Sequence, residues 1–131
     1  MKNLDTYLEM SLLEEDKYLM EMASIGDIDN KLIIIIRSND PGNIPHFHIC
    51  DKTTLGSNFH TCVKIENAEY FHHTGKEDVL NTKQRKALIQ FLNSTCDLGI
   101  TYWKFLIMTW NSNNSSKKIS INCKMPDYSE L

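Results

Sequence analysis

The stretch Lys31-Leu32-Ile33-Ile34-Ile35-Ile36-Arg37-Ser38 decides the fold of this 131-residue chain. Branched side chains such as isoleucine pack well on a pleated sheet, so the stretch predicts a β-strand. Its apolar run is unbroken, which means that both faces of the strand are covered and that the strand lies inside the sheet. The run of five apolar residues is the longest in the chain. It is far shorter than the about 20 residues that a membrane-spanning helix needs.

The two segments that follow, 45–51 and 58–66, alternate between apolar and polar residues. Alternation with a period of two is typical of strands with one covered face. The intervening residues 52–57 include Gly56 and read as a hairpin loop. A further short strand is predicted within 68–73. We therefore predict an α+β fold, with a mainly antiparallel sheet of four to five strands and helices packed on one face.

Helical periodicity brackets the predicted sheet. Residues 1–22 carry apolar side chains at spacings of three and four, which predicts an N-terminal helical segment that continues through 18–25 into a first strand. Residues 26–30 read as a turn by composition. Asn81 and Thr101 are suited to cap two later helices, the first of which is expected to end at Gly99.

The end of the chain is expected to be less regular. Residues 111–116 are all Asn or Ser and predict a loop, and 119–131 predict a partly ordered, extended tail. Trp103 and Trp110 share one helical stripe, which favours core packing over a base-stacking platform. A chain of 131 residues and 15.2 kDa suits a single domain, 1–131.

The N-terminus has no apolar signal core, so we predict a cytoplasmic protein with no membrane contact. The four cysteines are then expected as free thiols, and no pair has the CxxC spacing of a zinc knuckle. Charge is uneven: residues 1–29 hold eight acids and two bases, whereas 82–124 hold seven bases and one acid. One interpretation is that the acidic and basic segments face each other or solvent. Alternatively, the basic segment 82–124 forms a surface for an anionic partner.

One polar face carries the candidate chemistry. On the two alternating segments, the side chains expected to share this face are His46, His48 and Cys50, with His60, Cys62 and Lys64. Two imidazoles at i and i+2 could act as acid and base, a thiol beside histidine could be a nucleophile, and the set could ligate a metal. It could also be a polar face satisfied by hydrogen bonds. Three cationic residues near a predicted helix start could contact phosphate: Lys83, Arg85 and Lys86.

The segment Pro45-His46-Phe47-His48-Ile49 carries a family resemblance. Together with 25–40, 62–70 and 81–91, it resembles the small bacterial family known as domain of unknown function 4160. Ile44 stands where that family has a first proline, and the chain is longer at both ends. The resemblance implies a strand carrying a His-Phe-His motif, with His46 and His48 as motif positions. It also implies a toxin-antitoxin-like role, with RNA or a protein as partner.

From these observations we predict a small cytoplasmic binding or interaction module. The alternative is an RNA-cleaving or other hydrolytic enzyme that uses His46 and His48 as acid and base without a metal ion or other cofactor. Cys50, His60, Cys62 and the nearby cationic side chains would then bind the ligand. The net charge of -3 argues against broad affinity for nucleic acid.

Overall fold

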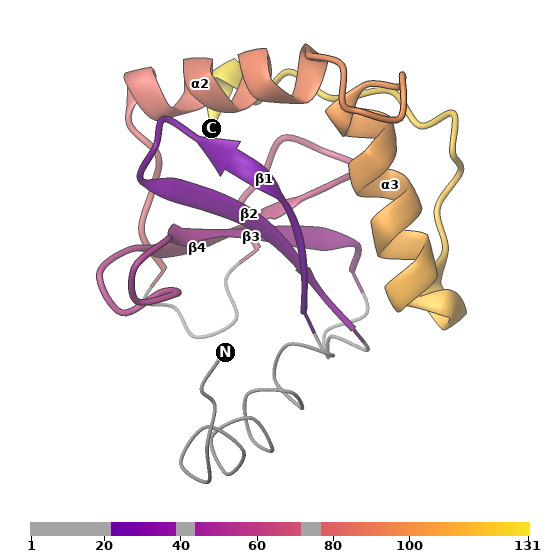
Figure 1. The fold of residues 1–131 in the computed structure, drawn as a ribbon, viewed down its shortest axis with the longest axis horizontal. Helices are drawn as coiled ribbons and strands as arrows, with labels where there is room; N and C mark the ends of the chain where they lie inside the picture. Colours follow the sequence, from indigo (N-terminus) through magenta and orange to yellow (C-terminus); the bar gives the residue numbers. More distant parts are fainter. Residues whose placement is uncertain (1–21, 39–43, 72–76) are drawn as a thin grey trace, which may run out of the picture.

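The computed structural model of the protein describes residues 22–38, 44–71 and 77–131 (Figure 1). Within them, an antiparallel sheet has the strand order β1-β2-β3-β4. The strands are β1 Met22–Ile28, β2 Leu32–Arg37, β3 His46–Asp51 and β4 His60–Lys64. Two helices pack on one face of this sheet, α2 Thr82–Asn93 and α3 Tyr102–Asn113. The predicted α+β class is therefore confirmed.

The isoleucine-rich strand β2 lies between β1 and β3, as its unbroken apolar run predicted. Ile34 and Ile36 are fully buried in the core between the sheet and the helices. Ile35 is buried to the same degree on the opposite face of the strand. Both faces of β2 are thus covered, which explains why the strand shows no polar alternation.

The first strand differs from the expectation. Residues 22–25, expected to continue a helix, and residues 26–28, expected to form a turn, all belong to β1. The rest of the expected helical segment, 1–21, lies outside the described residues. The turn is confined to 29–31, where Asp29 and Asn30 adopt φ of 51° and 70°. Asp and Asn are enriched in this left-handed region, which accounts for their position.

A β-bulge explains why the sequence pattern does not indicate a strand at β1. The register of β1 against β2 shifts between Ser24 and Gly26, with Ile25 as the extra residue. A bulge interrupts the alternation with a period of two by which a strand is recognised. Gly26 is needed at this point because a Cβ built on it would lie 2.5 Å from Cζ of Phe91 in α2.

Both helices begin where the sequence predicted. The Asn81 side chain accepts a hydrogen bond from the backbone N–H of Gln84 at 2.8 Å, and the Gln84 side chain accepts one from Asn81 N–H at 2.9 Å. This reciprocal pair is a capping box. Thr101 caps α3 by accepting from Lys104 N–H at 3.1 Å.

The ends of the helices differ from the expectation. Helix α2 ends at Asn93 rather than at Gly99, because the Ser94 hydroxyl donates to the Phe91 carbonyl at 2.6 Å and closes the last turn. Helix α3 runs on to Asn113, into the stretch expected to be a loop. The Asn113 amide donates to the Thr109 carbonyl at 2.8 Å, so a polar residue there supports the helix.

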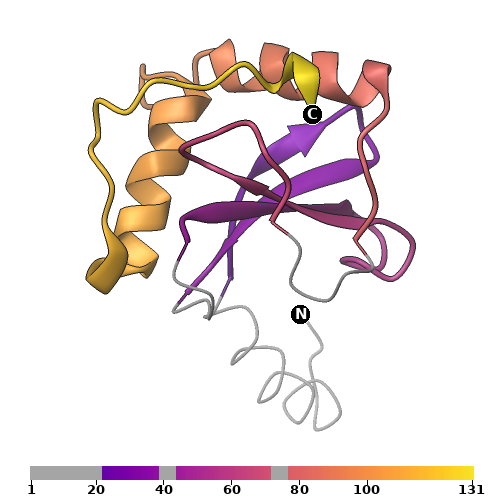
Figure 2. The ribbon, with the colours of Figure 1, turned by 180° about the vertical axis from the view of Figure 1, so that it is seen from behind.

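Residues 114–131 run beside α3 and then along α2, as Figure 2 shows from behind. They include two short 3-10 turns. Ser115–Lys117 begins in the expected loop, and Tyr128–Glu130 lies in the tail expected to be extended and partly ordered. The indole N–H of Trp110 donates to the Lys117 carbonyl at 2.9 Å, and that of Trp103 donates to the Cys123 carbonyl at 2.8 Å. Both tryptophans are buried, so they serve the core and hold the tail.

Tyr128 fixes the end of the chain against the sheet. Its ring is fully buried among core side chains, and its hydroxyl donates to the Lys64 carbonyl at 2.8 Å. Burial raises the pKa of this phenol above its ordinary value. Neither described helix is long and apolar enough to cross a lipid bilayer.

Candidate functional site

The pairing of β3 with β4 places the polar side chains predicted from alternation on one face. Three cross-strand pairs lie on it: His46 with Lys64, His48 with Cys62, and Cys50 with His60. The face is the one turned away from the core, since Phe47, Ile49 and Val63 point to the helices. The sheet therefore brings the residues of two sequence segments together, and the register decides which of them meet.

Three of these side chains converge on one point. Nδ1 of His48 lies 3.0 Å from Nε2 of His60 and 3.2 Å from Sγ of Cys62. Nε2 of His60 lies 3.6 Å from the same sulfur. Among the described residues, these three form the one group of His, Cys, Asp or Glu side chains with metal-ligand potential. We refer to His48, His60 and Cys62 as the His-His-Cys triangle.

The His-His-Cys triangle is largely closed to solvent. His48 is 4% exposed and Cys62 is 0% exposed, while His60 is partly buried. The rings of His48 and His60 stack with centroids 5.2 Å apart and an interplanar angle of 15°. Buried polar groups must be satisfied, and these three atoms contact one another. The contacts therefore satisfy part of the hydrogen-bonding need of a mostly buried polar cluster.

His46 lies beside the triangle but is not one of its three members. Its Nδ1 lies 2.6 Å from the carbonyl oxygen of Ile44, and because a carbonyl can only accept, this nitrogen carries the proton. The His46 ring packs edge-on against Phe71, with centroids 4.7 Å apart, and lies tilted against Trp110, with centroids 5.6 Å apart. Its centroid lies 5.0 Å from that of His48. The structure thus joins His48 to β4 through ring nitrogen contacts and leaves His46 in an aromatic setting.

Cys50 lies on the same face but outside the triangle. It is 1% exposed, and burial, reinforced by the negative charge of Asp51, raises the pKa of its thiol to about 11. The thiol is therefore neutral at physiological pH, and a neutral thiol is a poor nucleophile.

Asp51, a residue that the sequence analysis missed, organises the loop between the two strands. Its carboxylate accepts hydrogen bonds from two threonine hydroxyls and four backbone N–H groups, donated by Thr53, Thr54, Gly56, Asn58 and Phe59. The Thr54 hydroxyl, followed by the backbone donors, holds the pKa of this carboxyl well below its usual range. The sequence signal was an aspartate followed closely by threonines and a glycine, which is typical of side-chain-closed turns. The loop therefore fixes the register that forms the triangle.

The cationic candidates do not gather around the triangle. The Lys64 ammonium pairs with the Glu69 carboxylate at 2.8 Å. Arg85 donates to the carbonyls of Leu80 and Ser129 at 2.8 and 3.1 Å, so its guanidinium holds the tail. Lys83 and Lys86 are exposed on the first turns of α2.

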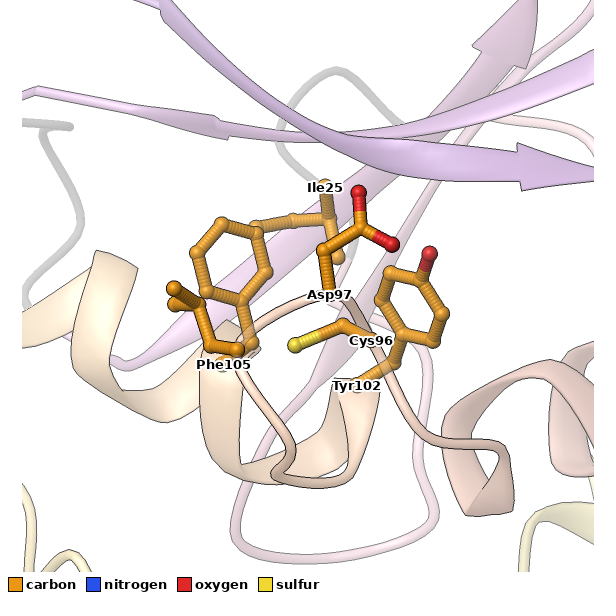
Figure 3. Close-up of a pocket in the computed structure, with 6 residues that line it drawn as sticks. Ile25, Cys96, Asp97, Tyr102 and Phe105 are labelled. Atoms are coloured by element: carbon orange, nitrogen blue, oxygen red, sulfur yellow. The ribbon is translucent and has the colours of Figure 1, made fainter.

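A separate pocket lies where β1 meets the loop between α2 and α3 (Figure 3). It is lined by Ile25, Cys96, Asp97, Leu98, Tyr102 and Phe105. Ligand sites combine an apolar lining with several converging polar groups. Here one exposed carboxylate, that of Asp97, is the single charged group in the lining. The pocket lies on the helix side of β1, away from the triangle, and sequence reasoning gave no signal for it.

Comparison with known proteins found no matching family model, no matching curated protein and no matching solved structure. The resemblance to domain of unknown function 4160 therefore stays a prediction.

Proposed function

We propose that the chain is a small binding module whose ligand is a transition-metal ion of the zinc class, held by the His-His-Cys triangle. The observation that carries the proposal is the mutual distance of three ligand atoms, 3.0, 3.2 and 3.6 Å. Imidazole nitrogen and thiolate sulfur are the ligands that zinc prefers in proteins. This proposal departs from the metal-free pair of His46 and His48 expected from the sequence.

The size of the triangle supports a tetrahedral ion. Zinc binds imidazole nitrogen at about 2.0–2.1 Å and thiolate sulfur at about 2.3 Å, so a tetrahedral site needs about 3.3 Å between nitrogens and about 3.6 Å between nitrogen and sulfur. The observed distances of 3.0, 3.2 and 3.6 Å lie within about 0.4 Å of these values. An opening of that size needs only small side-chain rotations, with no change of strand register.

The protonation of the three ligand atoms also supports a bound metal ion. Three mutually contacting nitrogen and sulfur atoms can share one or two protons, whereas one cation satisfies all three lone pairs. Binding requires neutral imidazoles and a thiolate, so it would release the Cys62 proton. A reducing cytoplasm, which we propose as the compartment, would keep this thiol available. Three ligands from the described residues leave the fourth tetrahedral position to water or another group.

The burial of the two motif histidines supports this choice over RNA cleavage. His46 is 1% exposed and His48 is 4% exposed. An acid and a base must both reach the phosphodiester that they cleave, within hydrogen-bond distance or through one water. The RNA-cleaving alternative therefore needs a conformation in which this face opens.

Zinc binding is tested on the full chain, purified without chelators and without a metal-affinity column. After loading with Zn²⁺ and dialysis, elemental analysis should find about one zinc per chain, and chelator competition gives the affinity. Because the loss of an outer hydrogen-bond partner already costs about 10–100-fold in affinity, His60→Ala and Cys62→Ser should each cost more than that. Cys96→Ser is the matched control and should bind like the wild type. A wild type that retains no zinc, or ligand variants that bind equally well, would overturn the proposal.

A further inference from the structure

The two ligands on β4 lie on an edge strand, and the structure supports them from outside the sheet. Strand β4 pairs with β3 on one side, and no other strand of the sheet flanks it in the described residues. Its outer edge is nevertheless hydrogen-bonded at each ligand. Phe71 N–H donates to the Cys62 carbonyl at 2.9 Å, and Asp78 N–H donates to the His60 carbonyl at 2.8 Å.

Asp78 also contacts His60 through its side chain. Its Oδ2 accepts the His60 backbone N–H at 2.9 Å, so one residue satisfies both main-chain groups of His60 on the open edge. The unpaired groups of an edge strand otherwise turn to solvent, and strand ends open more readily than strand centres. His60 is the first residue of β4, where such opening would begin.

We infer that Asp78 is a positioning residue of the metal site, which acts by holding the main chain of His60 so that Nε2 meets His48 and Cys62. The inference rests on the proposed function, because it concerns the same triangle. A ligand constellation must be held within about 0.5 Å to bind well, and a His60 backbone that moves carries its ring with it. The role belongs to the position of the acceptor oxygen and not to the charge of Asp78.

The inference can be tested by substituting Asp78, because its side chain is exposed. Its removal leaves no buried cavity, so a loss of metal affinity would not merely reflect a damaged core. Two substitutions separate acceptor position from charge. Asp78→Asn keeps an oxygen in place without the charge, and Asp78→Glu keeps the charge but moves the oxygen by one methylene.

We expect Asp78→Ala and Asp78→Glu to weaken Zn²⁺ binding by about 10–100-fold, the usual cost of losing an outer hydrogen-bond partner, and Asp78→Asn to stay within about threefold of the wild type. The visible spectra of the Co²⁺-loaded forms report ligand geometry. They should change in Asp78→Ala and Asp78→Glu and stay like the wild type in Asp78→Asn. Glu69→Ala is the control, because it removes a carboxylate from the same edge of β4 without contacting His60.

The outcomes separate this inference from the proposed function. If the wild type binds no zinc, the proposed function fails, and the role of Asp78 fails with it. If the wild type binds zinc and Asp78→Ala binds it equally well with an unchanged Co²⁺ spectrum, only the positioning role is overturned. Weakening by Asp78→Asn but not by Asp78→Glu would also overturn it, since charge would then be the cause. If Asp78→Ala does not fold, the Asn and Glu variants decide the question.

Discussion

The two faces of the β3–β4 pair are both largely buried but chemically opposite. Toward the helices, Phe47, Ile49 and Val63 are 0% exposed and form part of the core. On the other face, His48 is 4% exposed and Cys62 is 0% exposed. Apolar burial stabilises the fold directly, whereas burial of polar groups costs free energy unless they are satisfied. The mutual contacts of His48, His60 and Cys62 therefore offset part of the cost of burying polar groups on this face, which is why the proposed metal site is placed there.

The core face should show the largest effect of a single substitution. We expect Ile34→Ala to lower the free energy of unfolding by about 2–5 kcal/mol, because a fully buried isoleucine leaves a cavity. Ile35→Ala should cost a comparable amount, since that side chain is buried on the other face. Urea unfolding measures both. Val79→Ala, at a side chain that is 64% exposed, is the control and should change little. Losses below about 0.5 kcal/mol at both isoleucines would contradict the central position of β2.

The second prediction concerns the pH dependence of stability and the carboxylate of Asp51. Asp51 ends β3 at a position whose side chain points to the core side of the sheet, and its carboxylate accepts hydrogen bonds from the loop that follows. Its hydrogen bonds hold the pKa of the carboxyl below its unfolded value near 4, so the folded state binds fewer protons. Its stabilisation is complete above that unfolded value and is lost as the pH falls through the folded pKa. Asp51→Asn should therefore lower the melting temperature at neutral pH and flatten its decline below about pH 5.

Thermal melts from neutral to acid pH test this expectation. Asp97→Asn, at an exposed carboxylate lining the separate pocket, is the control and should keep the wild-type slope. An Asp51→Asn protein that loses stability in acid as steeply as the wild type would show that this carboxylate does not hold the loop.

The smallest predicted change in stability is at Thr61, where a substitution should raise the free energy of unfolding and not lower it. Thr61 lies on the core face, 0% exposed, and its hydroxyl oxygen has no hydrogen-bond partner. Thr61→Val removes an unsatisfied buried group while keeping the shape, so it should raise stability by about 1 kcal/mol. Thr109→Val is the control, because the Thr109 hydroxyl donates to the Phe105 carbonyl at 2.8 Å. A destabilised Thr61→Val protein would mean that this hydroxyl has a role in the core.

The sequence predicted the parts of the fold that depend on local chemistry. The apolar run of β2, the alternation of β3 and β4, and the caps at Asn81 and Thr101 are each contained in a few neighbouring residues. A first strand was expected, but the position of β1 was wrong because its bulge at Ile25 interrupts the alternation and Gly26 resembles a turn residue. The end of α2 was missed because Ser94, rather than a glycine, closes its last turn.

The candidate site was predicted as a face but not as a set of contacts. Alternation alone places His46 and His48 together, since they leave one strand on the same side. Their rings do lie together, with centroids 5.0 Å apart. The register between β3 and β4 also brings His48 opposite Cys62 and next to His60, which alternation within one strand does not predict. That register depends on the loop closed by Asp51, and the support of His60 depends on Asp78, 18 residues further along the chain. Neither contact is encoded in local periodicity.

X-ray absorption at the zinc edge of the loaded full chain tests the central claim most directly, because it reads the ligand atoms themselves. The account predicts one sulfur at about 2.3 Å and two imidazole nitrogens at about 2.0 Å. The sulfur should disappear in Cys62→Ser and remain in Cys96→Ser. A spectrum with only oxygen and nitrogen ligands, or with sulfur that survives Cys62→Ser, would contradict the claim that zinc is held by His48, His60 and Cys62.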